Sequence, residues 1–184
     1  MLERKKVLAI CGSTRKKSTN LNFIEAVSTL AQDKWQLEIY ENLASLPHFN
    51  PDLDNDTPPS EVAVLRRLVA GADGVLICTP EYALGVPGTL KNALDWTVSS
   101  SEFSRKPVAV ITAATSGIKA HESLLATLKM IEAELSEDYQ LVVSFAKSKI
   151  NHQSEITDEV TLAAINALIA AFNLSINTRL EREL

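Results

Sequence analysis

Hydroxyl-bearing and basic side chains are concentrated in residues 12–20, directly after an apolar run that ends at Cys11. This segment reads Gly-Ser-Thr-Arg-Lys-Lys-Ser-Thr-Asn, and apolar residues at helical spacing follow it. The N-terminus of a helix offers free N–H groups to an anion, and the guanidinium of Arg15 suits phosphate oxygens. The sequence therefore predicts a phosphate-binding loop built from hydroxyls, backbone and one arginine.

The same loop lacks the two best-known phosphate signatures. A Walker A loop ends in Gly-Lys-Ser/Thr, and a dinucleotide fingerprint needs three glycines, whereas this segment contains only Gly12. A monophosphate therefore fits the loop better than a triphosphate held with magnesium. The alternative is an ordinary capped loop with a basic surface.

A second unusual segment, residues 79–88, reads Thr-Pro-Glu-Tyr-Ala-Leu-Gly-Val-Pro-Gly and follows another apolar run. Pro80 and Pro87 restrict the backbone, while Gly85 and Gly88 allow it to approach a flat ligand closely. A stiff loop with free N–H groups and an aromatic side chain suits a heteroaromatic ring. The alternative is a strand-to-helix turn whose prolines and glycines serve no ligand.

A third, weaker signal lies after the apolar run 108–113, where Ala114, Thr115, Ser116 and Gly117 follow Ala113. The other patterns in the chain do not favour a metal ion or a hydrolase. The three histidines are far apart in the sequence and lack the spacing of a metal site. The chain also has no Gly-x-Ser-x-Gly elbow.

Strand-like and helix-like segments alternate along the chain. Apolar or alternating runs predict strands at 7–11, 35–40, 74–79, 108–113 and 140–145, and helical spacing separates them. Ser60 and Thr157 are candidate helix caps. Five such units predict an α/β, flavodoxin-like three-layer sandwich with a parallel sheet in the order 2-1-3-4-5. A ligand would then lie beyond the carboxyl ends of the strands, at loops 12–20, 79–88 and 113–120.

Length and composition indicate one ordinary globular domain over residues 1–184. Hydrophobic residues make up 46% and charged residues 22%, and the net charge of −5 disfavours nucleic acid as the main partner. No leader peptide and no apolar stretch close to a membrane span is recognisable, so no membrane partner is expected. Two cysteines at the ends of apolar runs fit a reducing compartment, which predicts a cytoplasmic protein.

The first two loops resemble the signature loops of the NADPH-dependent FMN reductase family, which are flavodoxin-like NAD(P)H:FMN, quinone, azo and chromate reductases. The resemblance rests on Gly-Ser-Thr-Arg-x-x-Ser-x-Asn at 12–20 and on Thr-Pro-Glu-Tyr-x-x-Gly-x-Pro-Gly-x-Leu-Lys-Asn-Ala-Leu-Asp-Trp at 79–96. It extends over about residues 5–145. Family members usually have Asn where Ala83 stands, and a third loop richer in glycine.

The resemblance implies an FMN site made by all three loops. The implied contacts are Ser13, Arg15, Ser18, Thr19, Asn20 and Leu21 from the first loop, Pro80, Glu81, Tyr82 and Ala83 from the second, and Thr115, Ser116 and Gly117 from the third. The phosphate would lie on the first loop and the isoalloxazine ring on the second, with the third closing the remaining side. Ala83 lacks the side-chain amide that can reach the edge of the flavin ring.

The expected activity is an NAD(P)H oxidoreductase in which FMN supplies the redox chemistry, with no catalytic side chain and no metal. NADPH or NADH would donate a hydride, and a quinone-like, azo or metal-oxyanion acceptor would take two electrons in a ping-pong cycle. A homodimer or homotetramer is expected, with residues 44–60 and the segment carrying Leu94 and Trp96 beside the site. The alternatives are a flavodoxin-like electron carrier and an inactive flavin-binding module.

Overall fold

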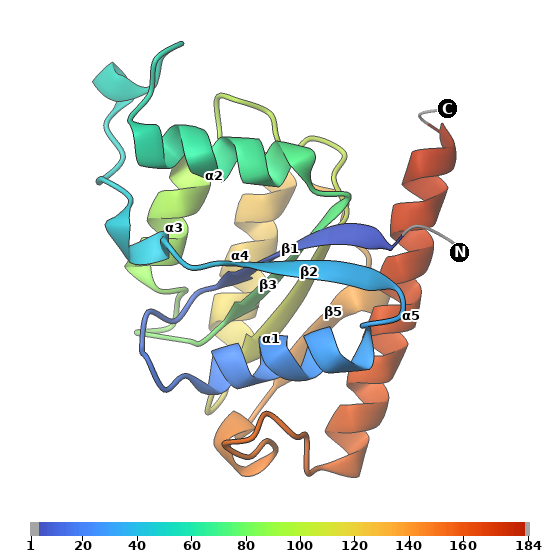
Figure 1. Ribbon diagram of the computed structural model, residues 1–184. Helices are drawn as coiled ribbons and strands as arrows, with labels where there is room; N and C mark the ends of the chain where they lie inside the picture. Colours follow the sequence, from blue (N-terminus) through green and yellow to red (C-terminus); the bar gives the residue numbers. More distant parts are fainter. Residues whose placement is uncertain (1–3, 183–184) are drawn as a thin grey trace.

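A five-stranded parallel sheet forms the centre of the protein, in a computed structural model that describes residues 4–182 (Figure 1). The strands are β1 (Lys5–Cys11), β2 (Trp35–Tyr40), β3 (Gly74–Thr79), β4 (Val108–Ala113) and β5 (Gln140–Val143). Their order is β2-β1-β3-β4-β5, and every neighbouring pair is parallel. The predicted flavodoxin-like order is therefore confirmed.

Helices cover both faces of the sheet, as crossover connections between parallel strands require. The helices are α1 (Thr19–Leu30), α2 (Ser60–Gly71), α3 (Gly88–Asp95), α4 (Ile118–Met130) and α5 (Glu159–Arg182). α1 and α5 pack on one face, and α2, α3 and α4 pack on the other (Figure 1). The sheet thus lies between two hydrophobic clusters.

The burial of each strand matches its sequence pattern. β3 and β4 are buried at every residue, as expected for continuous apolar runs inside a parallel sheet. The edge strand β2 alternates between apolar and polar residues. Its first and last residues, Trp35 and Tyr40, are buried, and the four residues between them are partly or fully exposed. The second and third predicted loops therefore begin at the ends of strands that are buried along their whole length, β3 and β4.

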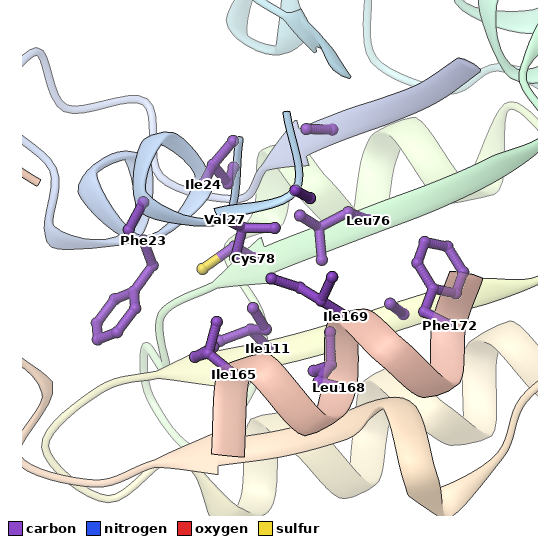
Figure 2. Packing of buried hydrophobic residues seen from close by; sticks show 14 of the residues in the cluster. Phe23, Ile24, Val27, Leu76, Cys78, Ile111, Ile165, Leu168, Ile169 and Phe172 are labelled. Atoms are coloured by element: carbon purple, nitrogen blue, oxygen red, sulfur yellow. The ribbon is translucent and has the colours of Figure 1, made fainter. Parts of the chain in front are cut away.

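Figure 2 shows the cluster on the α1 and α5 side, where apolar side chains from both helices meet those of β3 and β4. Phe172 of α5 packs edge-to-face against Trp35, with ring centroids 5.5 Å apart. α5 is long and apolar enough to cross a membrane by length and composition alone, so the expectation that no stretch approaches such a span was wrong. Its Ile165, Ile169 and Phe172 are buried against the sheet, and 33% of its most apolar window is buried in the fold.

Four predicted boundaries differ from the structure, the first being the start of β1, which lies at Lys5 and not at residue 7. The last helix is capped by Asp158, whose carboxylate accepts the N–H of Thr161 at 2.8 Å, and not by Thr157. α2 begins at Ser60 with Pro59 before it and no side-chain cap, so Ser60 is not the cap. β5 ends at Val143, because Phe145 adopts a positive φ of 52° that no strand residue has.

The long segment after β2 is tied to the α2 and α3 side of the fold. The indole N–H of Trp96 donates to the Pro47 carbonyl at 2.8 Å, and the Asn92 amide also donates to it at 2.9 Å. Trp96 and Leu94 are buried in the monomer. They are therefore core residues and offer no surface to a second subunit.

Arg66 of α2 fixes the same segment by an ion pair with Asp54 at 2.6 Å, and its guanidinium also donates to the Trp96 carbonyl. We expect Arg66→Ala to lower the free energy of unfolding by about 1.5–3 kcal/mol, because a charged donor is removed from partly buried acceptors. Urea denaturation measures the loss. Arg67→Ala, an exposed neighbour, is the matched control and should change little. Equal losses in both variants would contradict this role.

The same ion pair gives the protein a defined acid sensitivity. Arg66 lowers the pKa of Asp54 below its ordinary value. The resulting stabilisation is present above the unfolded pKa of about 3.9 and is lost as the pH falls through the folded pKa. Unfolding measured between pH 6 and acid should therefore depend less steeply on pH in the Arg66→Ala variant.

Candidate active site

A cavity of about 390 Å³ opens at the carboxyl edge of the sheet, where the loops after β1, β3, β4 and β5 meet. Most of the predicted site residues line it: Ser13, Arg15, Ser18, Thr19, Asn20, Pro80, Glu81, Tyr82 and Thr115. Ala113, Ala114, Phe145, Ala146, Lys147 and Ser148 complete the lining. The convergence of the three predicted loops on one cavity is confirmed, and a fourth loop joins them.

The first loop is held as the start of α1. The N–H of Gly12 donates to the Cys78 carbonyl at 2.8 Å, which anchors the loop on the neighbouring strand. The hydroxyl of Ser18 accepts the N–H of Leu21 at 3.4 Å and caps the helix. The N-terminal turn of α1, with its partial positive charge, therefore faces the cavity. Arg15 is exposed at the same end.

Asn20, in the first turn of α1, connects that helix to the carboxyl ends of β3 and β4. Its buried side-chain amide donates to the Ala113 carbonyl at 3.2 Å and accepts the thiol of Cys78 at 3.4 Å. Burial raises the pKa of the Cys78 thiol, so the sulfur keeps its proton and can donate. Asn20 is thus engaged within the fold, and its side chain positions the loops.

Glu81 connects the second loop to the third. Its carboxylate accepts the N–H of Ala120 at 3.0 Å, in the first turn of α4. Gly117 precedes that helix with φ of +93°, and an added Cβ would lie 3.2 Å from Thr112 and Val142. This backbone conformation favours glycine, which allows the third loop to turn sharply into α4.

A tight hairpin turn forms the tip of the second loop. Tyr82 and Gly85 exchange two backbone hydrogen bonds, of 2.8 and 3.0 Å, around Ala83 and Leu84. Both central residues have positive φ values, of 49° and 63°. Two-residue turns of this kind favour Asn and Gly, so Ala83 and Leu84 hold a strained backbone. Tyr82 and Leu84 are exposed at this tip.

We expect Ala83→Asn to raise the free energy of unfolding by up to about 1 kcal/mol, since Asn tolerates the left-handed conformation better than Ala. Thermal unfolding measures the gain. Ala83→Val is the matched variant and should destabilise, because a β-branched residue resists positive φ. The gain should appear in the protein without FMN, because it arises from the turn itself. A loss of stability with Asn would contradict the strain assigned to this position.

Residues 145–148 form a fourth wall of the cavity that the sequence analysis did not predict. It lies beside the third loop, because the N–H groups of Phe145 and Ala146 donate to the carbonyls of Thr115 and Ala114 at 3.1 and 3.0 Å. No motif marks this segment. A usable signal was its position, since Lys147 and Ser148 follow the predicted fifth strand and so reach the same edge of the sheet.

Four expected contacts lie outside the cavity lining: Leu21, Ala83, Ser116 and Gly117. The N–H of Leu21 is taken by Ser18, and the carbonyl of Ser116 accepts the Ser144 hydroxyl at 2.8 Å. Gly117 serves the turn before α4. Whether these residues contact a flavin stays a prediction.

Known proteins resemble this chain over nearly its whole length. It is 31% identical over 173 residues to the NADH:(hydroxy)cinnamate reductase subunit CrdA of Vibrio ruber, covering 91% of this chain and 85% of the relative. It is 31% identical to a 2-hydroxy-1,4-benzoquinone reductase of Burkholderia, covering 85% and 87%. The solved structure of FerB, a flavoenzyme NAD(P)H:(acceptor) oxidoreductase of Paracoccus denitrificans, matches with a TM-score of 0.81 at 28% identity, over 95% and 98% of the chains.

The family model agrees with these relatives and with the site. The model of NADPH-dependent FMN reductase matches residues 5–148, which include all four loops of the cavity. FMN as cofactor and NAD(P)H as substrate follow from this match. The chain belongs to the NADPH-dependent FMN reductase family and is an NAD(P)H-dependent FMN/quinone reductase.

Proposed function

We propose that FMN binds in the cavity with its phosphate at the N-terminus of α1 and its ring toward the second loop. The volume of about 390 Å³ lies within the range of cofactor sites. The first loop supplies Arg15 and hydroxyl groups, while Ala113, Ala114 and Ala146 line the cavity with small apolar side chains. This combination of a cationic, hydroxyl-rich loop and small apolar side chains in one cavity is the observation that carries the proposal, because FMN has a charged phosphate and a flat aromatic ring.

FMN, when bound, would supply the redox chemistry of hydride transfer from the nicotinamide and electron transfer to an acceptor. The residues of the chain bind and orient. Arg15 and the first turn of α1 hold the phosphate, and Pro80 limits the freedom of the second loop. Glu81, bonded to Ala120, keeps the second and third loops at a fixed separation. Tyr82 and Phe145 border the opening as exposed aromatic rings.

We infer that a quinone is the preferred acceptor, ahead of azo compounds and metal oxyanions. The support is twofold: relatives are named quinone reductases, and the aromatic rings of Tyr82 and Phe145 at the opening suit a planar substrate. One opening serves both substrates in turn, which favours ping-pong kinetics. Initial rates over a grid of NADPH and benzoquinone concentrations should give parallel double-reciprocal lines. Intersecting lines would overturn the alternating use of one site.

We propose further that a second copy of the chain covers part of the opening, giving a homodimer or a tetramer. The support is the exposed apolar surface of the loops that form the cavity, which a partner would shield: Tyr82 and Phe145 in the lining, and Leu84 and Ile118 in the same loops. Light scattering at micromolar concentration tests the assembly, and a fully active monomer would refute it.

We also propose a cytoplasmic location, because Cys11 and Cys78 are free, buried thiols, which fit a reducing compartment.

A further inference from the structure

Hydrogen bonds hold the segment after β5 to two other parts of the fold, the third loop and α1. Its backbone is bonded to the third loop at Thr115 and Ala114, as described above. The hydroxyl of Ser148 donates to the Phe145 carbonyl at 2.9 Å and closes the short 3₁₀ turn that follows. Lys147 and Ser148 are therefore presented by an ordered turn.

The same segment continues onto the first turns of α1. The side-chain amide of Asn22 donates to the Asn151 carbonyl at 2.9 Å. Thr19 lies one helical turn before Asn22 and hence on the same face of the helix. The first turn of α1 thus faces the chain that carries Lys147 and Ser148, and Thr19 lines the same cavity as both.

Lys147 is the basic residue of this segment that reaches the cavity. Its neighbour Lys149 lies outside the lining and is within 3.9 Å of the Asp158 carboxylate. Within residues 4–182, no carboxylate lies within ion-pair distance of the Lys147 ammonium. An exposed, unpaired cation thus lines the same cavity as Arg15, which follows β1, three strands across the sheet from β5.

We propose that Lys147 belongs to the FMN phosphate site, with its ammonium as a second cation beside Arg15. This inference rests on the proposed placement of the phosphate at α1. A phosphate dianion flanked by two cations and a helix N-terminus is stabilised at each oxygen, since charge-assisted hydrogen bonds are the strong ones. The proposed second cation comes from the loop after β5, and this loop lies outside the sequence motifs of the first three loops.

Binding of FMN and of riboflavin, measured by flavin fluorescence at low and high salt, tests the proposal. Lys147→Gln should weaken FMN about tenfold and riboflavin less than about twofold, with a smaller salt dependence for FMN than in the wild type. Lys149→Gln is the matched control from the same segment and should change neither affinity by more than about twofold. Lys147→Arg should retain most of the FMN affinity.

Two results would overturn the proposed role of Lys147. One is an equal loss of affinity for FMN and riboflavin in Lys147→Gln, and the other is an equal loss of FMN affinity in Lys147→Gln and Lys149→Gln. Unchanged FMN binding with an altered ratio of NADPH to NADH KM would also overturn it, because Lys147 would then serve the nicotinamide cofactor. Failure of the proposed function looks different. In that case the wild-type protein itself would bind FMN no more tightly than riboflavin.

Discussion

Replacing Arg15 by alanine should weaken FMN binding about 10- to 150-fold, because a hydrogen bond to a charged group contributes about 1.5–3 kcal/mol. Arg15 lines the cavity beside Ser13 and the first turn of α1, where the phosphate is proposed to lie. Riboflavin has no phosphate, so its affinity should change little. Calorimetric titration of each flavin into apoprotein measures both.

The control for this variant is Lys17→Ala. Lys17 is exposed in the same loop and does not line the cavity, so its loss should leave both affinities nearly unchanged. An equal fall in FMN and riboflavin binding on replacing Arg15 would remove the phosphate from this loop. A fall of similar size in Lys17→Ala would show that only the general charge of the loop matters.

Gly12→Ala should destabilise the protein by about 1–3 kcal/mol and loosen the first loop. A Cβ at this position would run into the Thr79 hydroxyl and lie 2.8 Å from Thr79 Cβ and 3.1 Å from Leu90 Cδ2. Thr79 is fully buried at the end of β3, so the clash must push the first loop away from the second. Urea denaturation and FMN titration should both register the change.

Gly71→Ala provides the matched glycine control. An added Cβ there meets nothing within 4 Å, and the residue is the last of α2. Alanine at that place should be neutral or stabilise by up to about 1 kcal/mol. If Gly12→Ala proves as well tolerated as Gly71→Ala, the close approach of the first loop to β3 is not needed for the fold.

The order of the sheet and most of the cavity could be predicted because their signals are local. Continuous apolar runs such as 74–79 identify buried parallel strands, and the topology then dictates which loops meet. The loop motifs supplied the rest, down to Arg15 and Glu81 in the cavity lining. What the motifs do not reveal is how the loops are held, for example that Glu81 caps α4.

The missed parts depend on contacts between residues distant in the sequence. The wall at 145–148 is formed by a residue with positive φ, Phe145, and by bonds to the third loop, neither of which periodicity shows. The segment carrying Leu94 and Trp96 was expected beside the site, yet neither residue lines the cavity, and both are buried where residues 47–49 contact that segment. Contacts with segments distant in the sequence, such as 47–49, therefore decide which helix surface is buried.

Anaerobic mixing of the FMN-loaded protein with NADH or NADPH tests the central claim most directly. The account predicts that the visible flavin absorbance is lost rapidly and returns when a quinone is added. Bound FMN that neither nucleotide bleaches would contradict the account and indicate an electron carrier or an inactive flavin-binding module.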